Sequence, residues 1–260
     1  MKPFLEQRRE RRKLLRAALV GFASGTLAGC DAITQNDDAV AVLRSAETLT
    51  KGVQRALGGR AMAQEFKTAD IAPVFRANGT LEPMGDEYAQ MVANGFADWR
   101  LKIDGLVNKP MEFSLADLRA MPSRTQITRH DCVEGWSCIG QWKGVRLSHV
   151  LGMAQLKPEA KFVVFHCLDQ MEEDDADSMY YESVDLDDAF HEQTILAYEL
   201  NGKALPVENG APLRARIERQ LGYKQPKYLY RIEAVSEFGS IAGGKGGYWE
   251  DQGYTWYGGI

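Results

Sequence analysis

The chain has 260 residues, of which 45% are hydrophobic, 26% charged and 10% aromatic. This is the composition of an ordinary globular protein, which excludes a disordered, collagen-like or coiled-coil chain. The net charge is −5, but residues 1–29 carry seven basic and two acidic side chains, which leaves −10 on residues 30–260. Because so acidic a body lacks the basic face that phosphates require, we expect no nucleic-acid partner.

The first thirty residues predict an export signal. The run Arg11-Arg12-Lys13-Leu14-Leu15-Arg16 is typical of a twin-arginine signal peptide. The apolar segment that follows, residues 17–28, is too short to span a bilayer and fits the apolar region of such a peptide. Leu27-Ala28-Gly29-Cys30 resembles a bacterial lipobox, which implies a signal peptide over residues 1–29 and a lipid anchor on Cys30. The alternative is a basic amphipathic helix that stays on the protein.

These features predict where the protein resides. We expect it in the periplasm, anchored to the inner membrane as a lipoprotein after twin-arginine export. Since the twin-arginine route carries folded proteins, often with a cofactor already inserted, the signal also points to a cofactor.

Residues 30–75 are predicted to form a helical spacer between the anchor and the body. Val40, Leu43, Ala46, Thr50, Val53 and Leu57 recur at steps of three and four residues. This spacing predicts one amphipathic helix that ends near Gly58-Gly59.

The body carries signals for both strands and helices, so we expect an α+β fold with a mixed β-sheet. Alternating or β-branched patterns predict strands over residues 99–104, 161–166, 180–186, 214–218 and 228–235. Helices are predicted after the N-cap Ser114, over residues 147–151 and over residues 187–200. The Gly- and aromatic-rich residues 243–260 show no periodicity, so packing must order them. Their aromatic side chains are core residues or the wall of a substrate funnel.

The cysteines leave the chemistry open. Besides Cys30 the chain has Cys132, Cys138 and Cys167. Because three is an odd number for an exported body, at least one of these thiols is either unpaired or bound to another group. The sequence allows a disulfide between two of them. It also allows a catalytic Cys–His pair, or a zinc site built from His130, Cys132, Cys138 and His166 or Cys167.

A longer pattern around Cys132 supports a fourth interpretation. The run Cys132-Val133-Glu134-Gly135-Trp136-Ser137, inside residues 130–145, resembles the molybdenum-ligating segment of the sulfite oxidase family. It is most similar to the branch that contains the periplasmic methionine-sulfoxide reductase catalytic subunit. Further motifs follow in the family's order: residues 202–206, 209–214 and 222–224, then Lys227 and Ile232. The resemblance starts near Asn78, so we assign residues 76–260 to an oxidoreductase molybdopterin-binding domain with the sulfite oxidase fold.

This resemblance implies a molybdenum–molybdopterin cofactor with Cys132 as the catalytic thiolate ligand of the metal. A soft thiolate suits a metal that also binds the dithiolene sulfurs of the pterin. The resemblance also implies cofactor-binding roles for seven further residues: Asn78, Cys167, Asn209, Arg214, Gln225, Pro226 and Lys227. Cys138 and Cys167 stand where the reductase branch has Met and Thr, so the substrate does not transfer with the motif.

The predicted function is therefore oxygen-atom or two-electron transfer on a small oxo substrate, such as a sulfoxide, an N-oxide or a sulfite-like anion. The sequence has no haem-binding domain before the catalytic one, so we expect a separate membrane cytochrome or quinone-linked redox partner. The alternative is a catalytically silent lipoprotein that keeps the fold as a binding module.

Overall fold

A computed structural model describes residues 37–58, 61–175 and 177–260. The predicted signal peptide and the lipidation site Cys30 lie outside these residues. The chain divides into two compact units, one ending at Leu57 and one running from Gly58 to Ile260. Within the described part of the first unit, helix α2 (Asp37–Gly58) confirms the predicted amphipathic helix and its end at Gly58. No helix of the described residues has the length and apolar character to cross a membrane.

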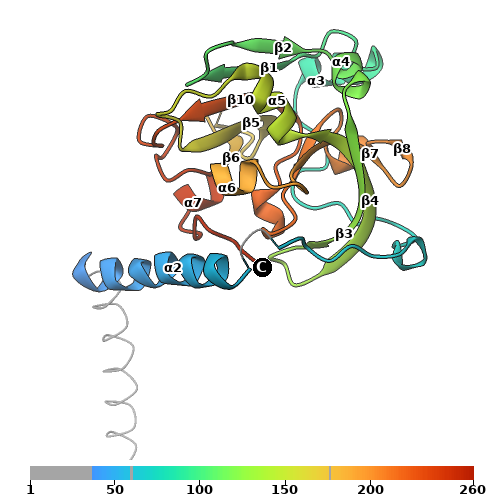
Figure 1. Ribbon diagram of the computed structural model, residues 1–260. Coiled ribbons are helices and arrows are strands. Elements are labelled where there is room, and N and C mark those ends of the chain that lie inside the picture. Colours follow the sequence, from blue (N-terminus) through green and yellow to red (C-terminus); the bar gives the residue numbers. More distant parts are fainter. Residues whose placement is uncertain (1–36, 59–60, 176) are drawn as a thin grey trace, which may run out of the picture. The chain divides into compact units, whose positions relative to one another are not determined.

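The second unit is built on two β-sheets (Figure 1). In the first sheet the strand order is β2-β1-β10-β5-β6. Its strands are β1 (Leu101–Gly105), β2 (Met111–Phe113), β5 (Phe162–Gln170), β6 (Met179–Asp185) and β10 (Leu229–Val235). Strands β1 and β10 are parallel and the other neighbours are antiparallel, so the sheet is mixed. This confirms the predicted α+β class.

The second sheet is antiparallel and has the order β3-β4-β7-β8, with β9 also paired to β7. Its strands are β3 (Ser123–Asp131), β4 (Ser137–Arg146), β7 (Ile195–Leu200), β8 (Lys203–Ala204) and β9 (Arg214–Arg216). The helices are α3 (Asp86–Ala93), α4 (Leu115–Ala120), α5 (Leu147–Ala154), α6 (Leu186–Ala189) and α7 (Tyr248–Asp251). Three 3-10 turns are η1 (Thr68–Asp70), η2 (Val207–Asn209) and η3 (Gly222–Lys224).

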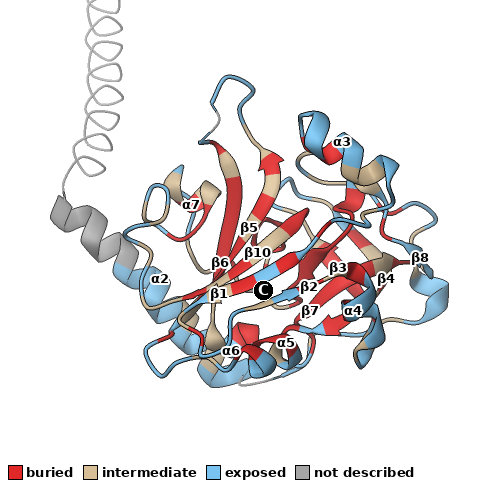
Figure 2. Ribbon diagram, turned by 90° about the horizontal axis from the view of Figure 1, so that it is seen from above, coloured by how far each residue is buried: buried red, intermediate tan, exposed pale blue. Residues whose placement is uncertain are grey.

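The main core joins side chains of both sheets with the apolar face of α5. Ile103, Val163 and Ile232 of the first sheet and Leu196 of the second belong to one buried cluster with Leu151 of α5. Figure 2 shows the central strands buried along most of their length, while the connecting loops are exposed. Each fully buried aliphatic side chain of this kind contributes about 1.5–3 kcal/mol to stability.

One predicted helix is wrong. Only residues 187–189 of the expected helix 187–200 are helical, as part of α6, and Ile195–Leu200 forms strand β7 between β4 and β9. This strand is almost continuously buried. A short apolar run carries no alternation that would separate a central strand from a buried helix. By contrast, α4 begins as expected, with the Ser114 hydroxyl accepting from the Asp117 backbone N–H at 3.1 Å.

Strand β3 was not predicted because its buried face is polar. Gln126, Thr128 and His130 point inward and are almost fully buried. Hydrophobic alternation is the signal that identifies strands in a sequence, and here the inward positions carry none.

Residues 61–75, which the sequence analysis grouped with the spacer, lie on β3 and β4. The Phe66 N–H donates to the Ile127 carbonyl at 2.8 Å, and the Ala72 N–H donates to the Ile139 carbonyl at 3.0 Å. Phe75 is buried with its ring edge-on to Trp142, and the ring centroids are 4.9 Å apart. This segment therefore belongs to the body by packing, and the compact unit begins at Gly58.

Candidate functional site

The β3–β4 hairpin presents Cys132 at its tip. Its register runs unbroken from Ser123 opposite Val145 to Asp131 opposite Ser137. The turn is closed by the Cys132 N–H, which donates to the Trp136 carbonyl at 2.9 Å, and by the Gly135 N–H, which donates to the Cys132 carbonyl at 3.0 Å. Gly135 has a φ of 84°, a conformation that glycine adopts without a steric penalty. The resulting Cys132 side chain is a half-buried free thiol.

A buried ion pair packs against strand β3 of the hairpin. Arg216 of β9 binds the Glu218 carboxylate with two nitrogens, at 2.6 and 3.1 Å, and donates to His130 Nδ1 at 3.0 Å. Gln126 Nε2 donates to the same Glu218 carboxylate at 2.8 Å. Burial and the neighbouring Arg216 hold the pKa of His130 well below its ordinary value. These contacts account for Gln126 and His130 on the polar inward face of β3.

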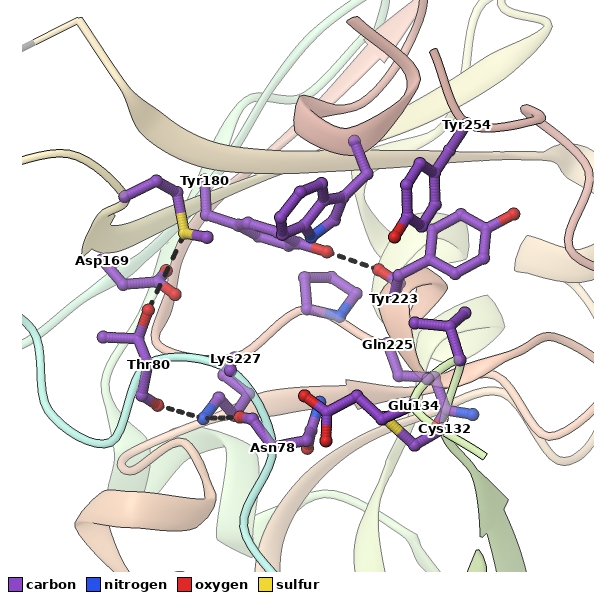
Figure 3. Close-up of a pocket in the computed structure, with 16 residues that line it drawn as sticks. Asn78, Thr80, Cys132, Glu134, Asp169, Tyr180, Tyr223, Gln225, Lys227 and Tyr254 are labelled. Carbon is purple, nitrogen blue, oxygen red and sulfur yellow. Dashed lines mark hydrogen bonds between the residues drawn. The ribbon is translucent and has the colours of Figure 1, made fainter. Parts of the chain in front are cut away.

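Cys132 opens into a cavity of about 190 Å³ (Figure 3). The cavity is lined by segments far apart in the sequence: Asn78, Gly79, Thr80, Cys132, Val133, Glu134, Asp169, Met171, Tyr180, Gly222, Tyr223, Gln225, Pro226, Lys227, Trp249 and Tyr254. Five of the predicted site residues are among them, namely Asn78, Cys132, Gln225, Pro226 and Lys227. The cavity thus brings most of the predicted site residues to one place, as expected of a ligand site.

Lys227 connects two of these segments through hydrogen bonds. Its ammonium donates to the Asn78 carbonyl at 2.6 Å, to the Thr80 carbonyl and to the Glu208 carbonyl at 3.1 Å. An ammonium has three N–H donors, and these three carbonyls occupy them. Burial and the Arg214 guanidinium lower the pKa of Lys227. This lysine therefore lines the cavity and holds the Asn78–Thr80 segment in place.

Arg214 and Asn209 lie behind the cavity wall. The fully buried Arg214 guanidinium donates to the Asn209 carbonyl at 3.0 Å and to the Gln225 carbonyl at 3.3 Å. It also stacks on Trp142, at 5.0 Å from the ring centroid. The structure thus connects three of the predicted site residues through one side chain.

Several buried polar atoms around the cavity have no hydrogen-bond partner among the described residues. They are Asn78 Oδ1, Asn209 Nδ2, Arg214 Nε, Gln225 Oε1 and Asp169 Oδ1. Buried polar groups are nearly always hydrogen-bonded, because an unpaired one costs about 1–3 kcal/mol. Donors and acceptors of this kind match a ligand that carries a polar ring system and a phosphate. The residues present therefore fit a molybdopterin.

The Cys132 thiol lies beside a carboxylate that faces the cavity. Glu134 accepts from Trp136 Nε1 at 2.8 Å, and Arg76 Nη2 lies 3.8 Å from the same carboxylate oxygen. Burial, together with the charge of Glu134, raises the pKa of Cys132, while Arg76 acts in the opposite direction. A metal ion that binds this sulfur would have to displace its proton.

Cys167 is not among the residues that line the cavity. It is buried on β5, and burial raises the pKa of its thiol well above the ordinary value. The three cysteines of the described body are free thiols, so no two of them form a disulfide. Within the described residues no three His, Cys, Asp or Glu side chains gather into a metal site, which removes support for the zinc alternative.

Several cavity residues, among them Thr80, Asp169, Met171 and Tyr180, were not identified from the sequence as part of a site. Asp169 and Tyr180 come from the first sheet, whereas Trp249 and Tyr254 come from the C-terminal tail. The tail aromatics had carried only the general expectation of a core or a funnel wall. In the sequence, nothing distinguishes Tyr180 and Asp169 from ordinary strand residues. Only the packing of β5 and β6 brings them to the cavity.

The sequence matches the family described as oxidoreductase molybdopterin binding domain over residues 89–240. The chain belongs to this family. It is therefore an oxidoreductase of the sulfite oxidase fold, and the resemblance seen in the Cys132 motif is confirmed. The alternative of a catalytically silent binding module is not retained.

The chain is similar to two named relatives and to one solved structure. It is 34% identical over 255 residues to a protein of Azospira oryzae that carries the provisional name protein-methionine-sulfoxide reductase subunit YedZ1, covering 96% of this chain and 87% of that protein. It is 35% identical over 148 residues to the protein-methionine-sulfoxide reductase catalytic subunit MsrP of Campylobacter jejuni, covering 54% of this chain and 50% of that protein. The sulfane dehydrogenase SoxCD of Paracoccus pantotrophus is similar with a TM-score of 0.47 and 27% identity, over 54% of this chain and 39% of that one.

Proposed function

We propose that this protein is an exported molybdenum–molybdopterin oxidoreductase that reduces sulfoxides, with Cys132 as the protein ligand of the metal. The observation that carries the proposal is the position of one free thiol at a cavity surrounded by unpartnered polar atoms. The names of two relatives support sulfoxide as the substrate.

The bound cofactor would supply the oxygen-atom and electron chemistry, since its metal alternates between two oxidation states that differ by two electrons. The chain's own residues bind and orient it. Asn78 and Gln225 offer unpartnered polar atoms at the cavity, Asn209 and Arg214 offer others directly behind its wall, and Lys227 adds a buried amine. The buried Arg214 guanidinium directly behind the wall would favour the phosphate of the cofactor through its charge.

The apolar side of the cavity would receive the substrate and exclude water. Met171, Tyr180, Tyr223, Trp249 and Tyr254 form this side. A sulfoxide takes up two electrons and two protons and yields the sulfide and one water. We propose that the electrons come from a separate membrane cytochrome or quinone-linked partner.

Export and anchoring complete the proposal. The twin-arginine and lipobox motifs would place the enzyme in the periplasm, held at the inner membrane through Cys30. Replacing Arg11 and Arg12 by lysine should block export, and Cys30→Ala should release the exported protein from membranes. Cell fractionation measures both effects, and a protein that stayed membrane-bound without Cys30 would refute the anchor.

Metal content and turnover test the assignment of Cys132. The purified wild type should contain about one molybdenum per chain and should reduce sulfoxides with a reduced dye as electron donor. The Cys132→Ser variant should lose turnover and most of the metal. The matched control is Cys138→Ser, because Cys138 lies outside the cavity lining and should keep both.

The same turnover assay also distinguishes among the candidate substrates. N-oxides and sulfite are assayed in parallel, with an oxidised dye as acceptor for sulfite. Turnover of sulfite alone would overturn sulfoxide as the substrate, while full metal content in Cys132→Ser would overturn the ligand.

A further inference from the structure

Lys224 is a fully buried cation that binds two carboxylates. Its ammonium donates to Glu182 Oε1 and to Glu250 Oε1, the latter at 2.6 Å, and the three side chains are at most 1% exposed. Lys224 lies in η3, between cavity residues Tyr223 and Gln225, but does not itself line the cavity.

The three members of this cluster come from three different walls of the cavity. Lys224 is adjacent to Tyr223, Glu182 is two residues along β6 from Tyr180, and Glu250 is adjacent to Trp249 in α7. All three of these aromatic residues line the cavity. The Tyr180 hydroxyl also donates to the Tyr223 carbonyl at 2.6 Å, so two of the walls meet directly. One ammonium therefore connects three aromatic walls.

Helix α7 depends on such contacts for its position. With four residues it is too short to be stable alone. It lies beside β6 (Figures 1 and 2), where the Tyr181 hydroxyl donates to Asp251 Oδ2 at 2.5 Å. The backbone approaches the cluster closely at Gly247, where a Cβ would lie 2.0 Å from Glu250 Oε2. The tail is thus packed directly against the charged cluster.

The positive charge of Lys224 is needed to keep the two buried carboxylates close together. Glu182 Oε2 and Glu250 Oε2 are buried and have no hydrogen-bond partner in the described part of the chain. Without the ammonium, two buried carboxylates would face each other across the β6–α7 contact. Removing one partner from a buried ion pair leaves an uncompensated charge, which favours any opening that admits water.

We propose that Lys224 is a positioning residue, which holds α7 against β6 and thereby sets the aromatic wall that faces the substrate. It acts through Tyr180, Tyr223 and Trp249. The inference about the substrate rests on the proposed function, whereas the inference about the tail does not.

The test compares Lys224→Met with the wild type in the full-length, cofactor-loaded protein. Chymotrypsin cleavage after Trp249 and Tyr254, followed by mass spectrometry, should be about tenfold faster in the variant because the tail opens locally. With methionine sulfoxide as substrate, KM should rise about tenfold while kcat changes less than about threefold. The matched control is Lys245→Met, because Lys245 contacts α7 from the exposed surface, with Nζ 3.1 Å from the Asp251 carbonyl. It should change neither readout.

If Lys224→Met does not fold, a second variant tests the proposal. Glu250→Gln removes one charge from the tail side and keeps an amide in its place, and tail cleavage should be about threefold faster. Wild-type protection of the tail together with a wild-type KM would overturn the proposal. If the wild type reduces no sulfoxide but Lys224→Met still exposes the tail, the proposed function fails and the role of Lys224 in holding the tail stands.

Discussion

The Lys227 ammonium lies 2.6 Å from the backbone carbonyl oxygen of Asn78, a residue 149 positions earlier in the chain. The same ammonium binds the Glu208 carbonyl, next to Asn209. Two amides that the family resemblance assigns to the cofactor are therefore held by one buried cation. The contact explains how a loop before α3 and a loop before β10 form one site.

Replacing Lys227 by Met should weaken both the fold and the site. Three buried carbonyls would lose their donor, and each unsatisfied acceptor costs about 1–3 kcal/mol. We expect lower stability in urea and a molybdenum content well below that of the wild type. Lys203→Met on the exposed strand β8 serves as the control and should change neither. Unchanged metal content in Lys227→Met would show that the hydrogen bonds of Lys227 to the two loops are not needed for metal binding.

The buried pair of Arg216 and Glu218 should be important for stability. Both side chains are completely buried, and removing Arg216 leaves an unpaired carboxylate, so Arg216→Met should cost about 3–5 kcal/mol. The double variant Arg216→Met/Glu218→Met should recover most of the loss. Chemical denaturation measures both, with the exposed Arg129→Met as control, expected within about 1 kcal/mol of wild type. Equal losses in the single and double variants would argue against charge burial as the cause.

The two charged neighbours of Cys132 should shift its thiol pKa in opposite directions. After burial, the Glu134 charge raises this pKa and Arg76 lowers it. In the cofactor-free protein Glu134→Gln should therefore lower the thiol pKa, and Arg76→Gln should raise it. The pH dependence of iodoacetamide alkylation, followed on the Cys132 peptide by mass spectrometry, measures both. Shifts of the same sign in the two variants would contradict the electrostatic explanation.

Asp104 should make the stability of the protein sensitive to acid. Although burial acts to raise its pKa, hydrogen bonds from Arg231 and Lys102 lower it below the ordinary value. A carboxylate with a lowered folded-state pKa stabilises the fold above its unfolded pKa of about 3.9, and this contribution disappears as the pH falls through the folded value.

The variant Asp104→Asn should therefore be less stable than the wild type at neutral pH and should lose less stability below about pH 4. Urea unfolding across this pH range measures the difference. Glu159→Gln, an exposed position, serves as the control and should follow the wild type. Parallel curves for Asp104→Asn and the wild type would show that Asp104 does not cause the acid sensitivity.

The sequence alone identified the family and the chemistry. The Cys132 motif and the 209–214 motif are local strings, and local strings can be recognised without coordinates. Helix α2, the Ser114 cap and strands β1, β5, β6, β9 and β10 were also predicted, because periodicity and capping are local properties. Strands β2, β4 and β8 were not predicted. Strand β3 was missed and β7 was assigned as a helix, since a polar buried face and a continuous apolar run carry no such periodicity.

Only the tertiary structure decided which side chains share the cavity. Tyr180 and Trp249 face the same space as Cys132, and Lys224 joins the walls that carry them, although nothing in the surrounding residues marks these positions. Of the residues that the family resemblance assigns to cofactor binding, Asn209 and Arg214 lie behind the wall and Cys167 is buried on β5. The physical reason is that a motif specifies the type of residue, while the direction of its side chain depends on strand pairing and on packing between segments distant in the chain.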